Sequence, residues 1–154
     1  MNIPKAVLAG AALAFHCAMG AAAGTGPLTV TDPWVRATVP GQKVAAAYMS
    51  LTASSRVALV AAKSPAARKA ELHSMTMEAG VMKMRQVARL DVMPGKPLVL
   101  APGGYHLMLV DVARELKAGE KVSIVLTVED DKGARRDINV DAPVREAAAQ
   151  PHKH

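Results

Sequence analysis

Short apolar stretches alternate with turn-forming segments along most of the chain, and this pattern predicts an all-β domain. The clearest stretch is KVSIVLTVE, residues 121–129, whose alternating apolar residues share one face of a strand: Val122, Ile124, Leu126 and Val128. Segments rich in glycine and proline, such as PGQK, MPGK and APGG, separate the stretches. Strands are predicted at 28–31, 34–38, 45–52, 57–62, 71–77, 82–90, 97–100, 105–110, 121–129 and 135–140.

The one stretch with helical character is AAKSPAARKAEL, residues 61–72, and Pro65 limits any helix there. A length of 154 residues is enough for one domain with a proper core and too short for two. Because 51% of the residues are apolar but only 3% are aromatic, aliphatic side chains and methionine must build that core.

The beginning of the chain is typical of an export signal. Lys5 supplies a positive start, a run rich in alanine and leucine follows, and Ala21, Ala22 and Ala23 offer small residues to a signal peptidase. The apolar run is short and is interrupted by His16, which argues against a membrane anchor. We therefore expect a protein of the periplasm with no membrane span after cleavage.

These features divide the chain into three parts. Residues 1–23 are expected to be the cleaved signal, residues 24–145 a single β domain, and residues 146–154 a flexible tail. His152 and His154 lie in this tail.

Cysteine usage and charge exclude several function classes. The only cysteine, Cys17, lies in the expected signal, so the mature chain would have no disulfide, no thiolate nucleophile, no Cys-based zinc site and no blue-copper centre. The net charge of +6 is spread along the chain without an aromatic platform, so no binding of nucleic acid is expected.

Four methionines and a histidine fall within HSMTMEAGVMKM, residues 73–84, which is predicted to form a β-hairpin. Because side chains alternate along a strand, His73, Met75 and Met77 point the same way. A loop of two or four residues pairs Met77 with Met82 and places Met82 and Met84 on the same face, whereas a three-residue loop turns Met84 away. We expect the even loop.

A second pair, His106 and Met108, lies two residues apart in GGYHLML and shares one face of a predicted strand. Zinc favours thiolate, imidazole and carboxylate, and calcium and magnesium favour oxygen, whereas neutral thioether sulfur selects Cu(I). A methionine at alternating spacing is usually core packing, and we assign Met49 and Met93 to packing. Two His-Met pairs on separate strands point instead to a metal.

The spacing from His73 to Met108 is H-x10-M-x21-H-x-M, which resembles the signature of the PCuAC family of periplasmic copper chaperones. The flanking segments DPWVRATVPGQKVAAAYMSLT, AELHSMTMEAGVMKMRQV, LVLAPGGYHLMLVDV and LKAGEKVSIVLTVED are similar to those of the family as well. The resemblance implies a cupredoxin-like Greek-key β-sandwich that binds one Cu(I) ion. The ligands that it implies are His73, Met84, His106 and Met108. Met75, Met77 and Met82 would then border the site or pack beneath it. His152 and His154 in the tail are candidates for a weak Cu(II) site, and the alternative is a polar end without a ligand.

The resemblance also implies a function. Members of this family are implicated in supplying copper to the CuA centre of cytochrome c oxidase subunit II, alongside a Sco-type thioredoxin-like protein. The alternatives from the sequence are a periplasmic copper buffer without a dedicated client and a β-sandwich interaction module with incidental methionines. We do not expect an enzyme, because no further histidine accompanies the four ligands in these motifs to assist catalysis.

Overall fold

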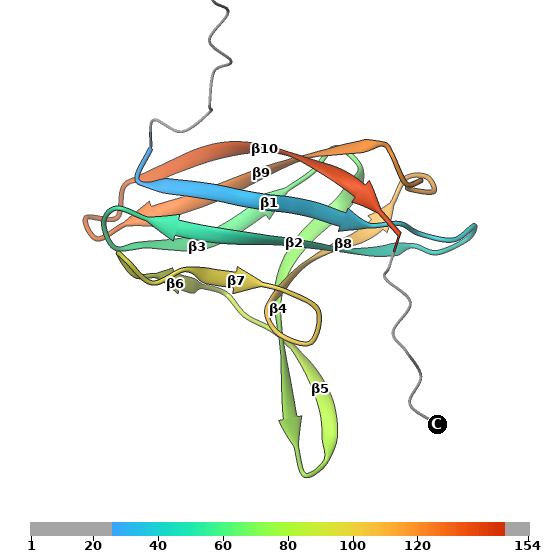
Figure 1. Cartoon of the computed structure of the whole chain (residues 1–154), viewed down its shortest axis with the longest axis horizontal. Helices are drawn as coiled ribbons and strands as arrows, with labels where there is room; N and C mark the ends of the chain where they lie inside the picture. Colours follow the sequence, from blue (N-terminus) through green and yellow to red (C-terminus); the bar gives the residue numbers. More distant parts are fainter. Residues whose placement is uncertain (1–25, 147–154) are drawn as a thin grey trace, which may run out of the picture.

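The computed structural model describes residues 26–146, and over that range the chain forms ten β-strands (Figure 1). Their bounds are β1 Leu28–Arg36, β2 Val44–Ala53, β3 Val57–Lys63, β4 Ala67–Glu78, β5 Val81–Gln86, β6 Leu90–Val92, β7 Leu98–Leu100, β8 His106–Val112, β9 Lys121–Asp130 and β10 Arg135–Arg145. None of the described residues belongs to a helix with the length and hydropathy needed to cross a membrane.

The strands lie where the alternating pattern predicts them, with two differences in how they are divided. The predicted strands 28–31 and 34–38 are one strand, β1, whose register against β2 shifts between Thr31 and Trp34. Asp32 has a φ of 46° there, so the chain bends without leaving the sheet. The predicted strand 82–90 is divided into β5 and β6.

The helical interpretation of residues 61–72 is wrong. This stretch contains the end of β3, a turn and the first half of β4. The Ser64 hydroxyl donates a hydrogen bond to the Ser123 carbonyl at 2.7 Å and accepts one from the Ala66 amide at 3.2 Å, which stabilises a turn next to Pro65. This turn chemistry and the pairing of both flanking strands override the helix propensity of alanine.

The sheet closes on itself. Its strand order is β5-β4-β8-β2-β1-β10-β9-β3-β6, and the additional pairing of β4 with β3, through Ala62 and Ala70, joins the two sides. The pairing of β1 with β10 is parallel, whereas the other strand pairs are antiparallel. The hairpin of β4 and β5 extends away from this body, with β5 at one end of the strand order (Figure 1).

One face of β4 and β8 packs in the core, and the opposite face is available for binding a ligand. Leu72 of β4 is the cross-strand partner of Leu107 of β8, and both side chains are buried in the apolar interior, as is Leu109. Since successive side chains alternate, the residues on either side of these leucines face the opposite surface of the sheet. Packing of the leucines therefore fixes the orientation of their neighbours on both strands.

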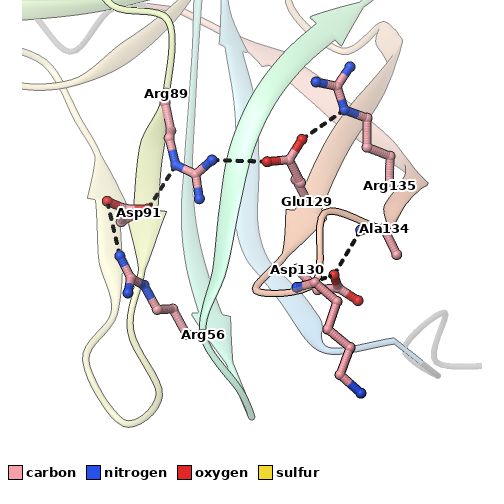
Figure 2. A network of polar contacts seen from close by, with 8 residues as sticks. Arg56, Arg89, Asp91, Glu129, Asp130, Ala134 and Arg135 are labelled. Atoms are coloured by element: carbon pink, nitrogen blue, oxygen red, sulfur yellow. Dashed lines mark hydrogen bonds and ion pairs between the residues drawn. The ribbon is translucent and has the colours of Figure 1, made fainter.

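A network of ion pairs joins β6 and the residue before it to β9 and β10 (Figure 2). The Glu129 carboxylate accepts hydrogen bonds from Arg135 at 2.9 Å and from Arg89 at 3.0 Å. Arg89 also donates to Asp91 at 3.1 Å. The network holds the short strand β6 against the longer strands of the sheet.

Candidate metal centre

Three neighbouring strands, β5, β4 and β8, carry the four expected ligands on one face. Their cross-strand partners are His73 with His106, Met75 with Met84, and Glu71 with Met108. Side chains of directly paired residues project from the same face, and positions two apart on a strand do so too. All four expected ligands therefore project from the face of the sheet opposite Leu72 and Leu107.

The hairpin turn places Met84 on this face. Glu78 pairs with Val81, so the loop consists of two residues, Ala79 and Gly80, with φ values of 50° and 78°. Positive φ at both central positions is the geometry of a type I′ turn. The expected even loop is confirmed, and Met77 pairs with Met82 as predicted.

His73 offers one nitrogen to a ligand and uses the other to fix its ring. Its Nε2 lies 3.0 Å from a carboxylate oxygen of Glu71. A carboxylate can only accept, so Nε2 carries the proton and the Nδ1 of the neutral ring has a free lone pair. Among the residues that the structure describes, this Nδ1 is the one buried side-chain nitrogen or oxygen without a hydrogen-bond partner. A buried polar atom without a partner requires a reason, and a metal ion supplies one.

A hydrogen bond also orients the ring of His106, but here it involves Nδ1 and leaves Nε2 free. Its side chain is buried, and its Nδ1 lies 3.2 Å from the carbonyl oxygen of Gly104. The carbonyl can only accept, so Nδ1 donates and the lone pair of the neutral ring is on Nε2. A second hydrogen bond of this kind, to a carbonyl or a carboxylate, is typical of histidines that bind metals.

The two imidazoles are close enough to share one ion. Their ring centroids are 5.7 Å apart. With a metal–nitrogen bond of about 2 Å, an ion lies about 3 Å from the centroid of each ring. The observed spacing of the His73 and His106 rings therefore fits a single ion between them.

The two methionines lie on opposite sides of His73, each diagonal to it across one strand. Met84 is opposite Met75 and is 47% exposed, whereas Met108 is half-buried between Glu71 of β4 and Ala46 of β2. Diagonal neighbours remain within reach of a long, flexible side chain. The structure thus pairs the histidines directly and places a thioether on each side of them.

The remaining methionines differ in their surroundings. Met49 is buried in the core, as predicted, but Met93 is 45% exposed, so the packing prediction for Met93 is wrong. Met93 lies in a tight turn between β6 and β7, where the chain leaves the core. Met77 and Met82 are exposed and Met75 is half-buried, so Met77 and Met82 do not pack beneath the expected site.

Glu71 and Gly104 are the contributors that the sequence analysis did not identify. Glu71 precedes His73 by two residues, and this spacing on a strand is a signal that the two side chains share a face. No comparable signal marks the Gly104 carbonyl, since its contact with His106 depends on how the preceding loop folds. The expected signal, residues 1–23, and the tail histidines His152 and His154 lie outside the described residues.

Comparison with known proteins identifies a family and a relative. Residues 28–144 match the LpqE-like family. Over 102 residues the chain is 33% identical to "Putative lipoprotein Lxx21020" of Leifsonia xyli subsp. xyli, and the match covers 66% of this chain and 61% of that relative. The chain thus spans about three fifths of the length of that relative.

Solved structures share the fold. Apo-DR1885 from Deinococcus radiodurans is 32% identical, with a TM-score of 0.60 over 96% of this chain and 97% of its own. The Cu(I) form of DR1885 is 35% identical, with a TM-score of 0.58 over 80% and 83% of the two chains. The copper-bound PCuAC domain from PmoF2 is 25% identical, with a TM-score of 0.63 over 79% and 95%.

The predicted all-β, cupredoxin-like fold is confirmed by these structures. The family match covers most of the described domain, and the resemblance to PCuAC proteins extends from the ligand spacing to the whole fold. The chain belongs to the LpqE-like family and is a PCuAC-type protein.

Proposed function

We propose that this protein is a Cu(I) metallochaperone in which His73, Met84, His106 and Met108 hold one ion. The observation that carries the proposal is the buried Nδ1 of His73, which has a lone pair and no partner and lies on the face shared with His106. Two imidazoles and two thioethers are neutral donors, and the thioethers favour the monovalent ion. The copper-bound relatives support the same choice of metal.

The site favours exchange over permanent binding. Met84 is 47% exposed and lies on β5, at one end of the strand order. Neutral donors hold the ion less tightly than thiolates, and an exposed ligand can be replaced by a donor from another protein. These properties suit a carrier that has to release its ion.

We further propose that the protein acts in the periplasm or elsewhere in the cell envelope after cleavage of residues 1–23. The lipoprotein names of the family and of its Leifsonia relative support export. The proposed client is the CuA site of cytochrome c oxidase subunit II, with a Sco-type protein as a second partner. No cysteine occurs after Cys17, so any reduction of client thiols has to come from that partner.

Replacing Met84 by leucine tests the ligand set directly. The change conserves volume and removes the sulfur, so the fold should persist while the affinity for Cu(I) falls by at least about tenfold. An anaerobic competition against a Cu(I) chelator measures the affinity, and copper K-edge absorption of the loaded protein reports the nitrogen and sulfur neighbours. Met93→Leu is the matched control, because Met93 has a similar exposure. An affinity that is equal in both variants would remove Met84 from the site.

Deleting the gene distinguishes a chaperone from a copper buffer. A chaperone mutant should lose oxidase activity when copper is limiting and regain it when copper is added. Loss of growth only at high copper would instead assign the protein to storage and protection. The proposed site serves either function, so this experiment tests the client and leaves the ligand set unaffected.

A further inference from the structure

A second pair of thioethers lies beyond the four proposed ligands, nearer to the tip of the hairpin. Met77 of β4 and Met82 of β5 are direct cross-strand partners, one step beyond the pair of Met75 and Met84. Since paired residues and positions two apart share a face, the sulfurs of all four residues project from the face that carries His73. The hairpin therefore presents a row of thioethers that leads from the histidines to its tip.

Packing does not explain the outer pair. Met77 is 65% exposed and Met82 is 43% exposed, although methionine normally fills gaps in the core. By contrast, Met49 of β2 is 2% exposed and packs in the interior. The side chains of the outer pair are thus exposed to solvent and do not contribute to the core.

The spacing of the outer pair suits one soft ion. Directly opposed residues of an antiparallel pair have Cβ atoms about 5 Å apart, and three rotatable bonds allow each thioether to turn toward the other. Two neutral sulfurs favour Cu(I) over harder ions and hold it weakly, since no imidazole is part of the pair. Weak binding is the property required of a site of passage.

The hairpin itself keeps the two methionines in register. On its opposite face Glu78 accepts hydrogen bonds from Arg85 at 3.0 and 3.1 Å and forms an ion pair with Lys83 at 3.0 Å. The two-residue turn follows directly after Glu78. Charges lie on one face and sulfurs on the other, so the metal face of the hairpin carries no competing cation from these pairs.

We propose that Met77 and Met82 form an outer Cu(I) site through which the ion enters and leaves the central site. This inference rests on the proposed function, because it presumes a central site formed by the four ligands. The transfer is a ligand exchange in which Cu–S bonds to the outer pair form as bonds to the inner ligands break. The ion remains Cu(I), and no electron or proton has to be supplied.

Methyl NMR of the full chain labelled with 13C-methyl methionine tests the two sites separately, with Ag(I) as a redox-inert probe. The first equivalent of Ag(I) should shift the methyls of Met84 and Met108, and the second should shift those of Met77 and Met82. Methyls of Met77 and Met82 that do not move with excess Ag(I) would overturn the outer site. An absence of shifts at Met84 and Met108 would instead overturn the central site.

Stopped-flow removal of Cu(I) by a chelator tests the route. In a variant with both Met77→Leu and Met82→Leu, the rate of removal should fall about tenfold, while the affinity for the first equivalent should stay within about twofold. Met93→Leu should leave both quantities unchanged. Removal at the wild-type rate from the double variant, or an equal slowing in the control, would refute passage through the outer pair.

Discussion

The carboxylate of Glu71 determines which nitrogen His73 offers to a metal. It lies 3.0 Å from Nε2 and leaves Nδ1 for the proposed ligand position. Without this partner the ring could take the other tautomer or rotate away from His106. In the proposed site Glu71 is therefore a positioning residue, since it would act on the ion through His73.

Replacing Glu71 by glutamine tests this role. Glutamine retains the size and can still accept from Nε2, but it is neutral, so we expect the affinity for Cu(I) to fall by about tenfold. Chelator competition measures the affinity, and a thermal melt of the metal-free protein should change little. Glu115→Gln, between β8 and β9, serves as the control. Equal affinities in the two variants would limit Glu71 to a structural role.

At the scale of residues, the sequence predicts the sharing of faces but not the hydrogen bonds. Alternation alone places Met108 on the same face as His106. An even number of residues in the hairpin loop places Met84 on the same face as His73. The tautomers of both rings depend on contacts with Glu71 and Gly104, which exist only once the strands have packed. The spacing of Glu71 and His73 indicates a shared face but not the hydrogen bond, and nothing in the sequence indicates the contact with Gly104.

At the scale of elements, the turn of the β4–β5 hairpin contains a strained residue. Ala79 has a φ of 50°, and a residue with a Cβ atom in the left-handed region costs about 1–2 kcal/mol, less for asparagine. We expect Ala79→Asn to stabilise the protein by about 1 kcal/mol and to raise its Tm by roughly 3 °C.

Calorimetry of the metal-free protein measures the effect of Ala79→Asn. Ala88→Asn, between β5 and β6, is a suitable control, because Ala88 is exposed like Ala79 and is not among the residues with positive φ. A gain in the control of the same size would attribute the effect to asparagine in general. A loss of stability in Ala79→Asn would contradict the I′ geometry of the turn.

The ion-pair network of Figure 2 predicts a dependence of stability on pH. Arg135 and then Arg89 lower the pKa of Glu129 through hydrogen bonds to its carboxylate. A lowered pKa in the folded state means that the stabilisation is present above the pKa of the unfolded chain and is lost as the pH falls through the folded value. Unfolding should therefore become easier in acid.

Glu129→Gln should lower the Tm near pH 7 and have less effect at an acid pH below the lowered pKa of Glu129, where the wild-type carboxylate is protonated as well. Thermal melts of the two proteins at both pH values measure the difference. Asp131→Asn, in the neighbouring turn, controls for the loss of one charge. A difference in Tm that is constant with pH would show that the charge on Glu129 is not the cause.

The same scale shows where prediction from pattern fails. Strands with clear alternation, such as β9, are located to within one residue, since one face is buried and the other is not. The pattern wrongly predicts a break between strands at Asp32 and a helix in the alanines of 61–72. In both stretches the structure depends on pairing with distant strands, which the pattern does not contain. Local propensity is a weak guide wherever such pairing decides the outcome.

At the scale of the whole molecule, the core and the face that carries the proposed ligands are the two sides of the same strands. Leu107 is fully buried between His106 and Met108, so its packing fixes the orientation of both. We expect Leu107→Ala to lower the free energy of unfolding by about 2–5 kcal/mol, as is usual for a leucine in a core. The affinity for Cu(I) should fall as well, because β8 loses its anchor.

Chemical denaturation of the metal-free protein measures the cost of Leu107→Ala. Val99→Ala is the matched control, because Val99 is 55% exposed and its truncation should change stability by less than about 0.5 kcal/mol. A loss in Leu107→Ala as small as in the control would contradict the burial of Leu107. If Leu107→Ala is destabilised but its Cu(I) affinity is unchanged, packing of Leu107 is not required for the geometry of the proposed site.

The order of strands in the closed sheet could not be obtained from alternation. The pattern predicts strands, but the neighbours of β1, which are β2 and β10, follow from contacts across most of the chain. The resemblance to the PCuAC family supplies the architecture that the pattern alone does not. His73 and His106 are cross-strand partners because β4 pairs with β8, which is also a long-range contact. The spacing of the ligands in the sequence therefore suggests this site but does not determine its geometry.

The parallel pairing of β1 with β10 brings Val35 beside Val144 and has a consequence for biogenesis. A polypeptide delivered N-terminus first has to wait for its last strand before the gap between β1 and β9 is filled. Until then two strand edges stay open to other chains, which favours aggregation. Maturation of the protein is therefore expected to be post-translational, and a chain truncated before Arg135 would be a substrate for proteolysis.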